Sequence, residues 1–401
     1  MKRILFTGYV LISACFLSGQ SPDHYYLKGM AALQQNQPEA AVQALNDAIG
    51  RNNSDERYYL CRADAYYRLG KFDLAASDYD EAGSIMPGCG DLGLARVYAA
   101  TGEAEKSIDC LKRHLRSDYR LSATTITKDL AFSPLHGMDE WHDLWQQDWY
   151  SDIEKAEAEV EYYLKKKDAG QALEFLNGKM TSFQKEARYY ALRAGAYFVQ
   201  ENYAAAVADY SMALSLNKTE PDYYFSRGLA FLRSERYKDA IDDFTKGLRY
   251  EPSRFAFYLE RAKANAGLYD YKTAAEDIEF YLGFFDGDQD AIALCGEMYF
   301  QYGDYINALK CFNKNLKADP NNPAYYKARG KTYVKTGTIA YGINDLSMSL
   351  DLKPDDGETW LYLGLAKYEM GDREAACSNL KKAQHYGNTL AVKYIVEYCI
   401  E

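Results

Sequence analysis

The chain has 401 residues, of which 48% are hydrophobic and 26% are charged, and only nine are proline. Its 58 acidic residues outnumber 47 basic ones, which gives a formal net charge of −11 at pH 7. This balance argues against a nucleic-acid partner, because contacts with phosphates need clustered Lys and Arg. It also argues against an electrostatic grip on anionic lipid.

The first twenty residues, MKRILFTGYVLISACFLSGQ, combine Lys2 and Arg3 with a short apolar run. The run ends too soon for a membrane span, and no later stretch of the chain is long and apolar enough for one. Residues 1–20 therefore predict a secretory signal peptide of bacterial style, and we expect the mature protein to be exported.

Two readings of the signal remain open. Ile12-Ser13-Ala14-Cys15 resembles a lipoprotein signal, in which Cys15 would be acylated and would anchor the protein to the outer membrane. Cleavage near Gly19 or Gln20 would instead release a periplasmic or secreted protein. We favour simple secretion, because Phe16 and Leu17 directly after Cys15 are unusual for a lipoprotein.

Residues 21–118 contain three similar units. In each, a small residue in one apolar run is followed by a small residue in a second run, and the two runs have helical spacing. These small residues are Gly29 and Ala41, Ala63 and Ala75, and Ala95 and Ser107.

Residues 119–152 interrupt this phase, because Ser107 and the next such residue, Ala172, are 65 positions apart. The segment holds three of the four tryptophans, Trp141, Trp145 and Trp149. They could form an aromatic binding platform, or they could pack over the exposed end of the third unit. We favour packing, and we expect a connector between two blocks of repeats.

Residues 153–387 repeat at a fixed period of 34. The small residue after the internal turn recurs seven times, at Ala172, Ala206, Ala240, Ala274, Ala308, Gly342 and Ala376. Such a period predicts stacked helical hairpins, because one hairpin cannot bury its apolar face alone and shares a core with its neighbours.

These units resemble the tetratricopeptide repeat (TPR) family. The unit ETWLYLGLAKYEMGDREAACSNLKKA follows the family pattern, although Lys367 stands where the family has an aromatic residue and Tyr368 comes one position late. The resemblance implies an all-α solenoid, a right-handed superhelix of antiparallel helix hairpins, with about ten repeats in two blocks. It also implies a protein that binds other proteins.

Residues 388–401 follow the last unit, and a solenoid needs a polar cap at its end. The stretch NTLAVKYIVEYC predicts a helix with Ala391, Ile395, Tyr398 and Cys399 on one face. That face should cover the helix that carries Cys377. A disulfide between Cys377 and Cys399 is therefore plausible, provided that the two Cα atoms lie within about 7 Å.

No pattern of residues indicates catalysis or a cofactor. The sequence has no glycine-rich phosphate loop after a strand, no GxSxG and no HExxH. His136, Glu140 and His142 fit no helical metal motif. We expect a non-enzymatic scaffold of the bacterial cell envelope, without metal or cofactor, that binds a peptide or a partner protein in its concave groove. The alternative is a structural subunit of an envelope or secretion assembly that uses the outer edge and the tryptophan connector.

The resemblance implies that the first helix of each unit lines the concave groove. It places apolar and then basic residues there: Phe198, Phe225, Leu229, Leu232, Leu259, Lys327, Lys331 and Lys335. An apolar stretch followed by a basic one suits an extended peptide with apolar side chains and an acidic group. Alternatively, the superhelix curls tightly, so that the apolar side chains pack on neighbouring repeats, and the lysines form a solvated stripe.

Overall fold

The computed structural model describes residues 21–399, and this part of the chain folds into α-helices and one 3-10 helix without strands. Consecutive helices pair as antiparallel hairpins, so the fold is an all-α repeat solenoid. The chain divides into two compact units, Met1–Tyr223 and Tyr224–Glu401. The predicted signal peptide and Cys15 lie outside the described residues.

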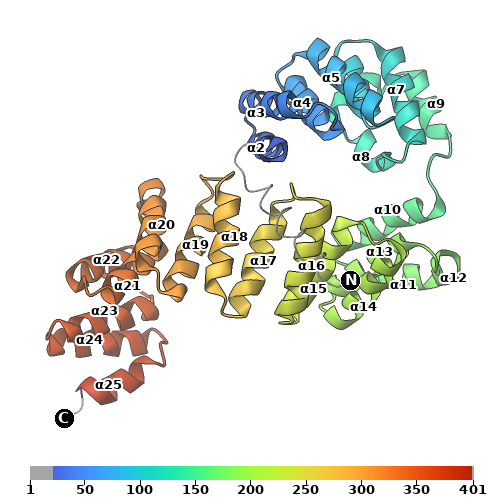
Figure 1. Cartoon of the computed structure of the whole chain (residues 1–401). Coiled ribbons are helices and arrows are strands. Elements are labelled where there is room, and N and C mark those ends of the chain that lie inside the picture. The colour runs from blue at the N-terminus through green and yellow to red at the C-terminus, as the bar shows by residue number, and fades with distance from the viewer. Residues whose placement is uncertain (1–20, 400–401) are drawn as a thin grey trace, which may run out of the picture. The chain divides into compact units, whose positions relative to one another are not determined.

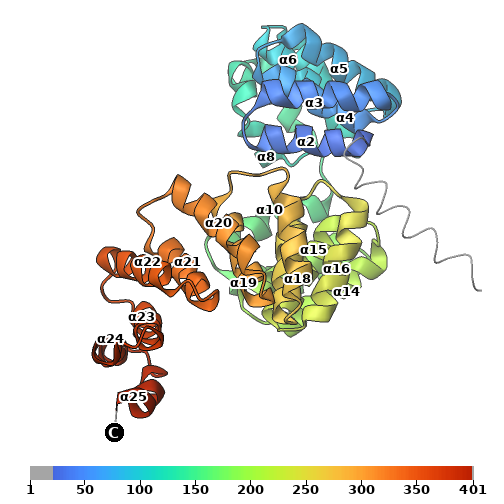
Figure 2. The same ribbon diagram turned by 60° about the vertical axis from the view of Figure 1, so that its left-hand side comes forward.

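The first unit contains three hairpins, a connector and two further hairpins, and Figure 2 shows the first block in blue. The three hairpins are α2 (Pro22–Gln34) with α3 (Pro38–Arg51), α4 (Glu56–Arg68) with α5 (Phe72–Ile85), and α6 (Asp91–Ala100) with α7 (Ala104–Arg116). The connector holds α8 (Ala123–Thr127), the 3-10 helix η1 (Leu130–Leu135) and α9 (Asp139–Gln146). Then follow α10 (Asp152–Lys165) with α11 (Ala169–Gly178), the short α12 (Met180–Phe183), and α13 (Ala187–Val199) with α14 (Tyr203–Leu216).

The second unit continues the hairpins from α15, whose first residues belong to the first unit, to a final single helix (Figure 1). The pairs are α15 (Pro221–Arg233) with α16 (Tyr237–Tyr250), α17 (Ala256–Gly267) with α18 (Tyr271–Leu282), α19 (Gln289–Tyr302) with α20 (Tyr305–Ala318), α21 (Pro323–Lys335) with α22 (Ile339–Leu352), and α23 (Gly357–Glu369) with α24 (Arg373–His385). The last helix is α25 (Ala391–Cys399).

Small residues let the two helices of each hairpin approach closely. Gly228 faces the fully buried Phe244, and a Cβ atom on Gly228 would lie only 2.6 Å from Phe244 Cε1. Gly296 packs against Phe312 in the same way, and a Cβ atom on Gly296 would lie 2.6 Å from Phe312 Cε1. The 34-residue spacing of small and large residues thus reports a repeated contact between helices.

A left-handed backbone residue ends the first helix of most hairpins. From position 167 onward it recurs every 34 residues, at Lys167, Glu201, Glu235, Tyr269, Gly303, Gly337 and Gly371. Only glycine adopts this conformation without a steric cost. The four other residues, among them Tyr269 with φ of 61°, therefore carry local backbone strain.

A bidentate ion pair joins the two helices of five hairpins. In each, an Arg on the first helix donates two hydrogen bonds, of 2.6 to 2.9 Å, to an Asp sixteen positions later on the second helix. The pairs are Arg62 with Asp78, Arg193 with Asp209, Arg227 with Asp243, Arg261 with Asp277, and Arg329 with Asp345. We call these contacts the Arg–Asp bridges.

The tryptophans of the connector pack inward. Trp141 is 5% exposed, and its ring lies 4.9 Å from that of His136 and 5.5 Å from that of Trp145. Trp145 and Trp149 pack against the same core, which includes Leu111 of α7. The connector therefore shares one hydrophobic core with the second and third hairpins.

Helix α25 packs on the second helix of the last hairpin. Ala391 is fully buried with Leu380 and Ala383, and Tyr398 stacks on Tyr368 with ring centroids 3.8 Å apart. The aromatic residue that comes one position late in the last repeat thus contacts the capping helix. A disulfide joins Cys377 to Cys399, with Cα atoms 5.7 Å apart.

Candidate interaction surface

The first helices of the second unit lie next to one another, since α19 contacts α21 and α21 contacts α23. The apolar residues predicted to line them are partly taken up in packing. Phe225 is half-buried, and its ring lies 5.0 Å from that of Phe257 and 6.0 Å from that of Phe244. The Arg254 guanidinium lies over the Phe225 ring, 4.9 Å from its centroid. Phe225 therefore belongs to the contact between neighbouring repeats.

The other predicted apolar residues keep part of their surface in solvent. Leu229, Leu232 and Leu259 are half-buried on α15 and α17. In the first unit, Phe198 is half-buried against Tyr203, with ring centroids 5.4 Å apart. Phe300 on α19 makes the equivalent contact with Tyr305 at 5.7 Å.

Two of the three predicted lysines are paired with carboxylates of the next repeat. Lys327 Nζ lies 3.1 Å from Asp356 Oδ2 and 2.9 Å from Glu358 Oε2, and Lys331 Nζ lies 3.0 Å from Glu358 Oε1. Lys331 Nζ also lies 4.7 Å from the Tyr362 ring centroid. We call Lys327, Lys331, Asp356 and Glu358 the lysine–carboxylate cluster.

The pKa values of the lysine–carboxylate cluster favour the charged form of all four side chains. Burial acts to lower the pKa of both lysines. Asp356 and Glu358 outweigh it at Lys327, and Tyr362 together with Glu358 outweighs it at Lys331, so the pKa of both lysines is raised. Burial acts to raise the pKa of Asp356 and Glu358, but the lysines outweigh it, so the pKa of both carboxyls is lowered. All four groups are therefore charged at neutral pH.

This arrangement corrects the expectation of a solvated basic stripe. Two lysines and two carboxylates sum to no net charge, and only Lys335, which is exposed, extends the basic character along α21. The sequence did not reveal the pairing, because Lys331 and Glu358 are 27 positions apart on helices of different repeats. An incoming carboxylate would have to compete with Glu358.

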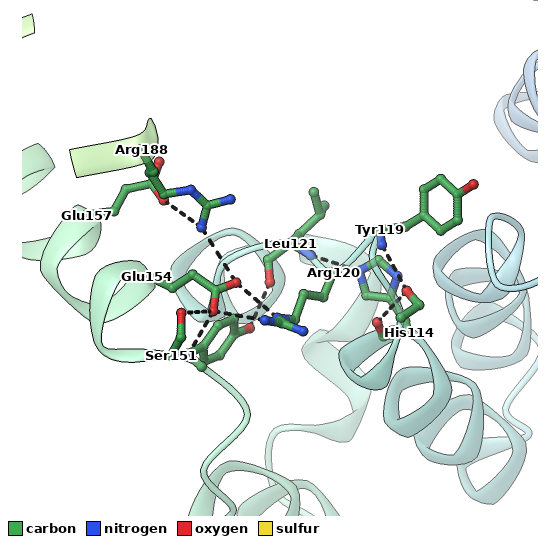
Figure 3. A network of polar contacts seen from close by, with 10 residues as sticks. His114, Tyr119, Arg120, Leu121, Ser151, Glu154, Glu157 and Arg188 are labelled. Atoms are coloured by element: carbon green, nitrogen blue, oxygen red, sulfur yellow. Dashed lines mark hydrogen bonds and ion pairs between the residues drawn. The ribbon is translucent and has the colours of Figure 1, made fainter. Parts of the chain in front are cut away.

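A second polar network joins the end of the first block to α10, as Figure 3 shows. Arg120 donates two hydrogen bonds of 3.0 Å to Glu154, which also accepts from the Ser151 backbone N–H and hydroxyl. Arg188 reaches from α13 to Glu157 at 3.4 Å and to Glu154 at 3.6 Å. The network thus ties three segments of the first unit together around one carboxylate.

Electrostatics keep this carboxylate ionised. Burial alone would raise the pKa of Glu154, but the hydrogen bonds from Arg120 and Ser151 outweigh it and lower the pKa to about 2. Glu154 is therefore a structural ion-pair partner.

His114 lies beside this network and is 2% exposed. Its Nε2 accepts a hydrogen bond of 3.1 Å from the Leu121 backbone N–H. The proton of the neutral ring is then on Nδ1, which is buried and has no partner among the described residues. Burial lowers the pKa of His114 to about 4, so the ring is neutral at physiological pH.

Residues 21–399 include no helix with the length and apolar character needed to cross a membrane. Within the same residues, no three or more His, Cys, Asp or Glu side chains gather in a way that could hold a metal ion. His136, considered above as a ligand, packs its ring on Trp141.

The sequence reasoning missed the Arg–Asp bridges and the acidic half of the lysine–carboxylate cluster. The bridges had a readable signal, because Arg193, Arg227 and Arg261 are 34 positions apart and each precedes an Asp by sixteen. Asp356 and Glu358 gave no such signal, because Lys327 and Lys331, with which they pair, have no lysines 34 positions before or after them.

Family models match four stretches of the chain. A model described as "Tetratricopeptide repeat" matches residues 26–84 and 225–288, and one described as "TPR repeat" matches residues 195–235 and 296–337. With the paired helices described above, these matches define the class of protein. The chain carries tetratricopeptide repeats in these stretches, and proteins with such repeats act as protein-interaction scaffolds.

Curated relatives match only short stretches. RNA polymerase II-associated protein 3 of Mus musculus is 26% identical over 87 residues, which cover 22% of this chain and 13% of that protein. Protein STIP1 homolog of Dictyostelium discoideum is 30% identical over 81 residues, covering 20% and 14%. The matches thus span about an eighth of the length of these relatives.

Solved structures are similar at low identity. A tetratricopeptide repeat protein from Parabacteroides merdae has a TM-score of 0.47 and 20% identity, covering 61% of this chain and 98% of that one. YrrB, described as a TPR protein with an unusual peptide-binding site, has a TM-score of 0.41 and 22% identity, covering 45% and 93%.

Proposed function

We propose that this protein is a non-enzymatic scaffold of the bacterial cell envelope that binds an extended peptide or a partner protein along the first helices of its second unit. The observation that carries the proposal is the half-exposed apolar row of Leu229, Leu232 and Leu259, followed along the unit by the lysine–carboxylate cluster. Apolar anchors with a charged group nearby suit a peptide that has apolar side chains and one carboxylate.

The envelope location rests on the N-terminal sequence. Lys2 and Arg3 before a short apolar run favour a cleaved secretory signal, with acylation at Cys15 as the alternative. Mass spectrometry of the protein from its native envelope tests this. An intact N-terminus at Met1 contradicts export, and a diacylglyceryl group on Cys15 makes the protein a lipoprotein.

Site-specific photocrosslinking tests the binding surface. A photoreactive amino acid at Leu259, on the first helix of its hairpin, should capture a partner in intact envelopes. The matched control is the same amino acid at Glu276, an exposed position on the second helix of that hairpin. Capture at Glu276 alone would instead favour a structural subunit that assembles through its outer edge.

The cluster makes a sharper prediction about the partner. Glu358→Gln removes the carboxylate that competes for Lys331 and should strengthen the binding of an acidic peptide. Lys331→Gln should weaken it, and the effect should shrink as salt rises. Equal affinity for both variants would contradict capture of a carboxylate at this cluster.

A further inference from the structure

Two cysteines occupy the place of an Arg–Asp bridge. Cys295 lies 34 residues after Arg261 and 34 before Arg329, and Cys311 has the same spacing from Asp277 and Asp345. The hairpin α19–α20 thus carries a thiol pair where the hairpins on both sides of it carry an ion pair. Because the equivalent Arg and Asp side chains contact each other in both neighbouring hairpins, the repeat geometry places Cys295 and Cys311 opposite each other.

The two thiols influence each other's pKa and differ in burial. Cys295 is 1% exposed, whereas Cys311 is half-buried and reachable from solvent. The neighbouring Cys295 thiol lowers the pKa of Cys311, with Lys314 and Lys310 acting in the same direction against burial and Glu279, and the pKa of Cys295 is raised. A reachable thiol of lowered pKa beside a resolving cysteine is the arrangement of redox-active sites.

We propose that Cys295 and Cys311 are a thiol–disulfide exchange site, in which Cys311 attacks a small disulfide such as oxidised glutathione and Cys295 resolves the product. The Cys311 thiolate forms a bond to one sulfur of the oxidant and expels the other as a thiolate. Cys295 then loses its proton, attacks Cys311 Sγ, and expels the second glutathione thiolate. The two cysteines are oxidised by two electrons, and one oxidised glutathione becomes two reduced molecules.

The new bond would link α19 to α20 across a short loop. A disulfide restricts the unfolded chain, so oxidation should stabilise this hairpin. Phe300 of the same α19 lies beneath Lys331, with the ammonium 5.6 Å from the ring centroid. The oxidation state would therefore act on a hairpin that supports the lysine–carboxylate cluster.

Peptide mapping of the full chain after incubation with oxidised glutathione tests the proposal. Trypsin cuts after Lys310, so the disulfide should join residues 273–310 to residues 311–314. Cys295→Ser should accumulate one glutathione on Cys311. At neutral pH, Cys311 should react with iodoacetamide several-fold faster than Cys89, a half-buried cysteine whose pKa is raised by burial.

Two further variants separate chemistry from folding. Cys295→Arg with Cys311→Asp copies the neighbouring hairpins and should fold normally without any shift in melting temperature on oxidation, whereas the native chain should melt at higher temperature once oxidised. Absence of the joined peptides, or equal alkylation rates at Cys311 and Cys89, would overturn the proposal. Equal oxidation-induced shifts in the native chain and the Arg–Asp variant would overturn it as well.

Discussion

The close contact between Gly228 and Phe244 makes a quantitative prediction about hairpin packing. In Gly228→Ala, the new Cβ would lie 2.6, 2.9 and 3.0 Å from three ring atoms of Phe244. Carbon atoms in contact prefer about 3.5–4.0 Å, so the ring must move by about 1 Å. Phe244 is fully buried against Phe225 and Phe257, and overpacking of this kind costs about 1–3 kcal/mol.

Gly195→Ala is the matched control. Its new Cβ would meet only the Tyr210 hydroxyl, at an ordinary 3.8 Å. Both substitutions gain the same helix propensity, about 1 kcal/mol, so this term cancels in the comparison. Gly195→Ala should stabilise its helix, and Gly228→Ala should be less stable than that by about 1–3 kcal/mol.

The next repeat supplies the compensating change, because it pairs Ala262 with Ile278 at the equivalent positions. Gly228→Ala with Phe244→Ile copies that pair and should lose less stability than the sum of the single changes, by at least about 1 kcal/mol. Hydrogen exchange of the α15 and α16 amides measures the local opening free energy, which is needed because repeat arrays do not unfold in one step. Additive effects, or equal effects of Gly228→Ala and Gly195→Ala, would refute the packing argument.

Three further outcomes follow from buried charge and backbone strain. Asp243→Ala removes the two hydrogen bonds that Arg227 donates to Asp243 and should cost about 3–5 kcal/mol, whereas Asp243→Leu with Arg227→Met should lie near the native stability; hydrogen exchange again measures both. His114 takes up its proton near pH 6.5 in the unfolded chain and near pH 4 in the folded chain. The free energy of unfolding should therefore decrease as the pH is lowered from 6.5 to 4, by up to about 3 kcal/mol, because the unfolded chain binds the proton more readily. Melting curves of His114→Gln should lose this dependence, and those of His142→Gln, an exposed residue, should keep it. Tyr269 has a left-handed backbone conformation and is 79% exposed. Tyr269→Gly should remove the backbone strain with little loss of packing and raise the stability of the hairpin by about 1 kcal/mol or less. A lowered melting temperature would contradict this.

The fold was predictable because each repeat imposes the same contact. The spacing of Gly228, Ala240 and Phe244 recurs along the chain, and a recurring pattern can be read from one sequence without any knowledge of the neighbouring helix. The tetratricopeptide character and the helical hairpins therefore followed from the residues. The extra helix α12, which buries Phe183, did not, because it occurs once and leaves the period unchanged.

The charge of the candidate surface was not predictable in the same way. Whether Lys331 is solvated or paired depends on the rotation of α23 against α21, which places Glu358 within 3.0 Å. A sequence period gives the register within a repeat but not this rotation. For the same reason, the unpartnered Nδ1 of His114 depends on one buried contact with Leu121 and has no counterpart elsewhere in the sequence.

The Arg–Asp bridges also hold neighbouring hairpins in register. Besides the two bonds to their Asp, bridge arginines donate a further hydrogen bond to the preceding hairpin, sixteen positions back, as Arg62 does to Asn46, Arg261 to Thr245, and Arg329 to Asn313. Paired buried charges contribute little net stability, whereas a side chain that bonds both ways fixes the position of one repeat on the next.

The cysteine hairpin cannot use this link, because Cys295 is too short to reach the residue sixteen positions back, which is Glu279. Tyr299, one helical turn after Cys295, lies near Glu279 instead, and burial together with this carboxylate raises the pKa of Tyr299. The contact between repeats is thus kept by Tyr299. Cys295 and Cys311 therefore do not need to form the ion pair that joins the two helices in the neighbouring hairpins, and both thiols can take part in disulfide exchange.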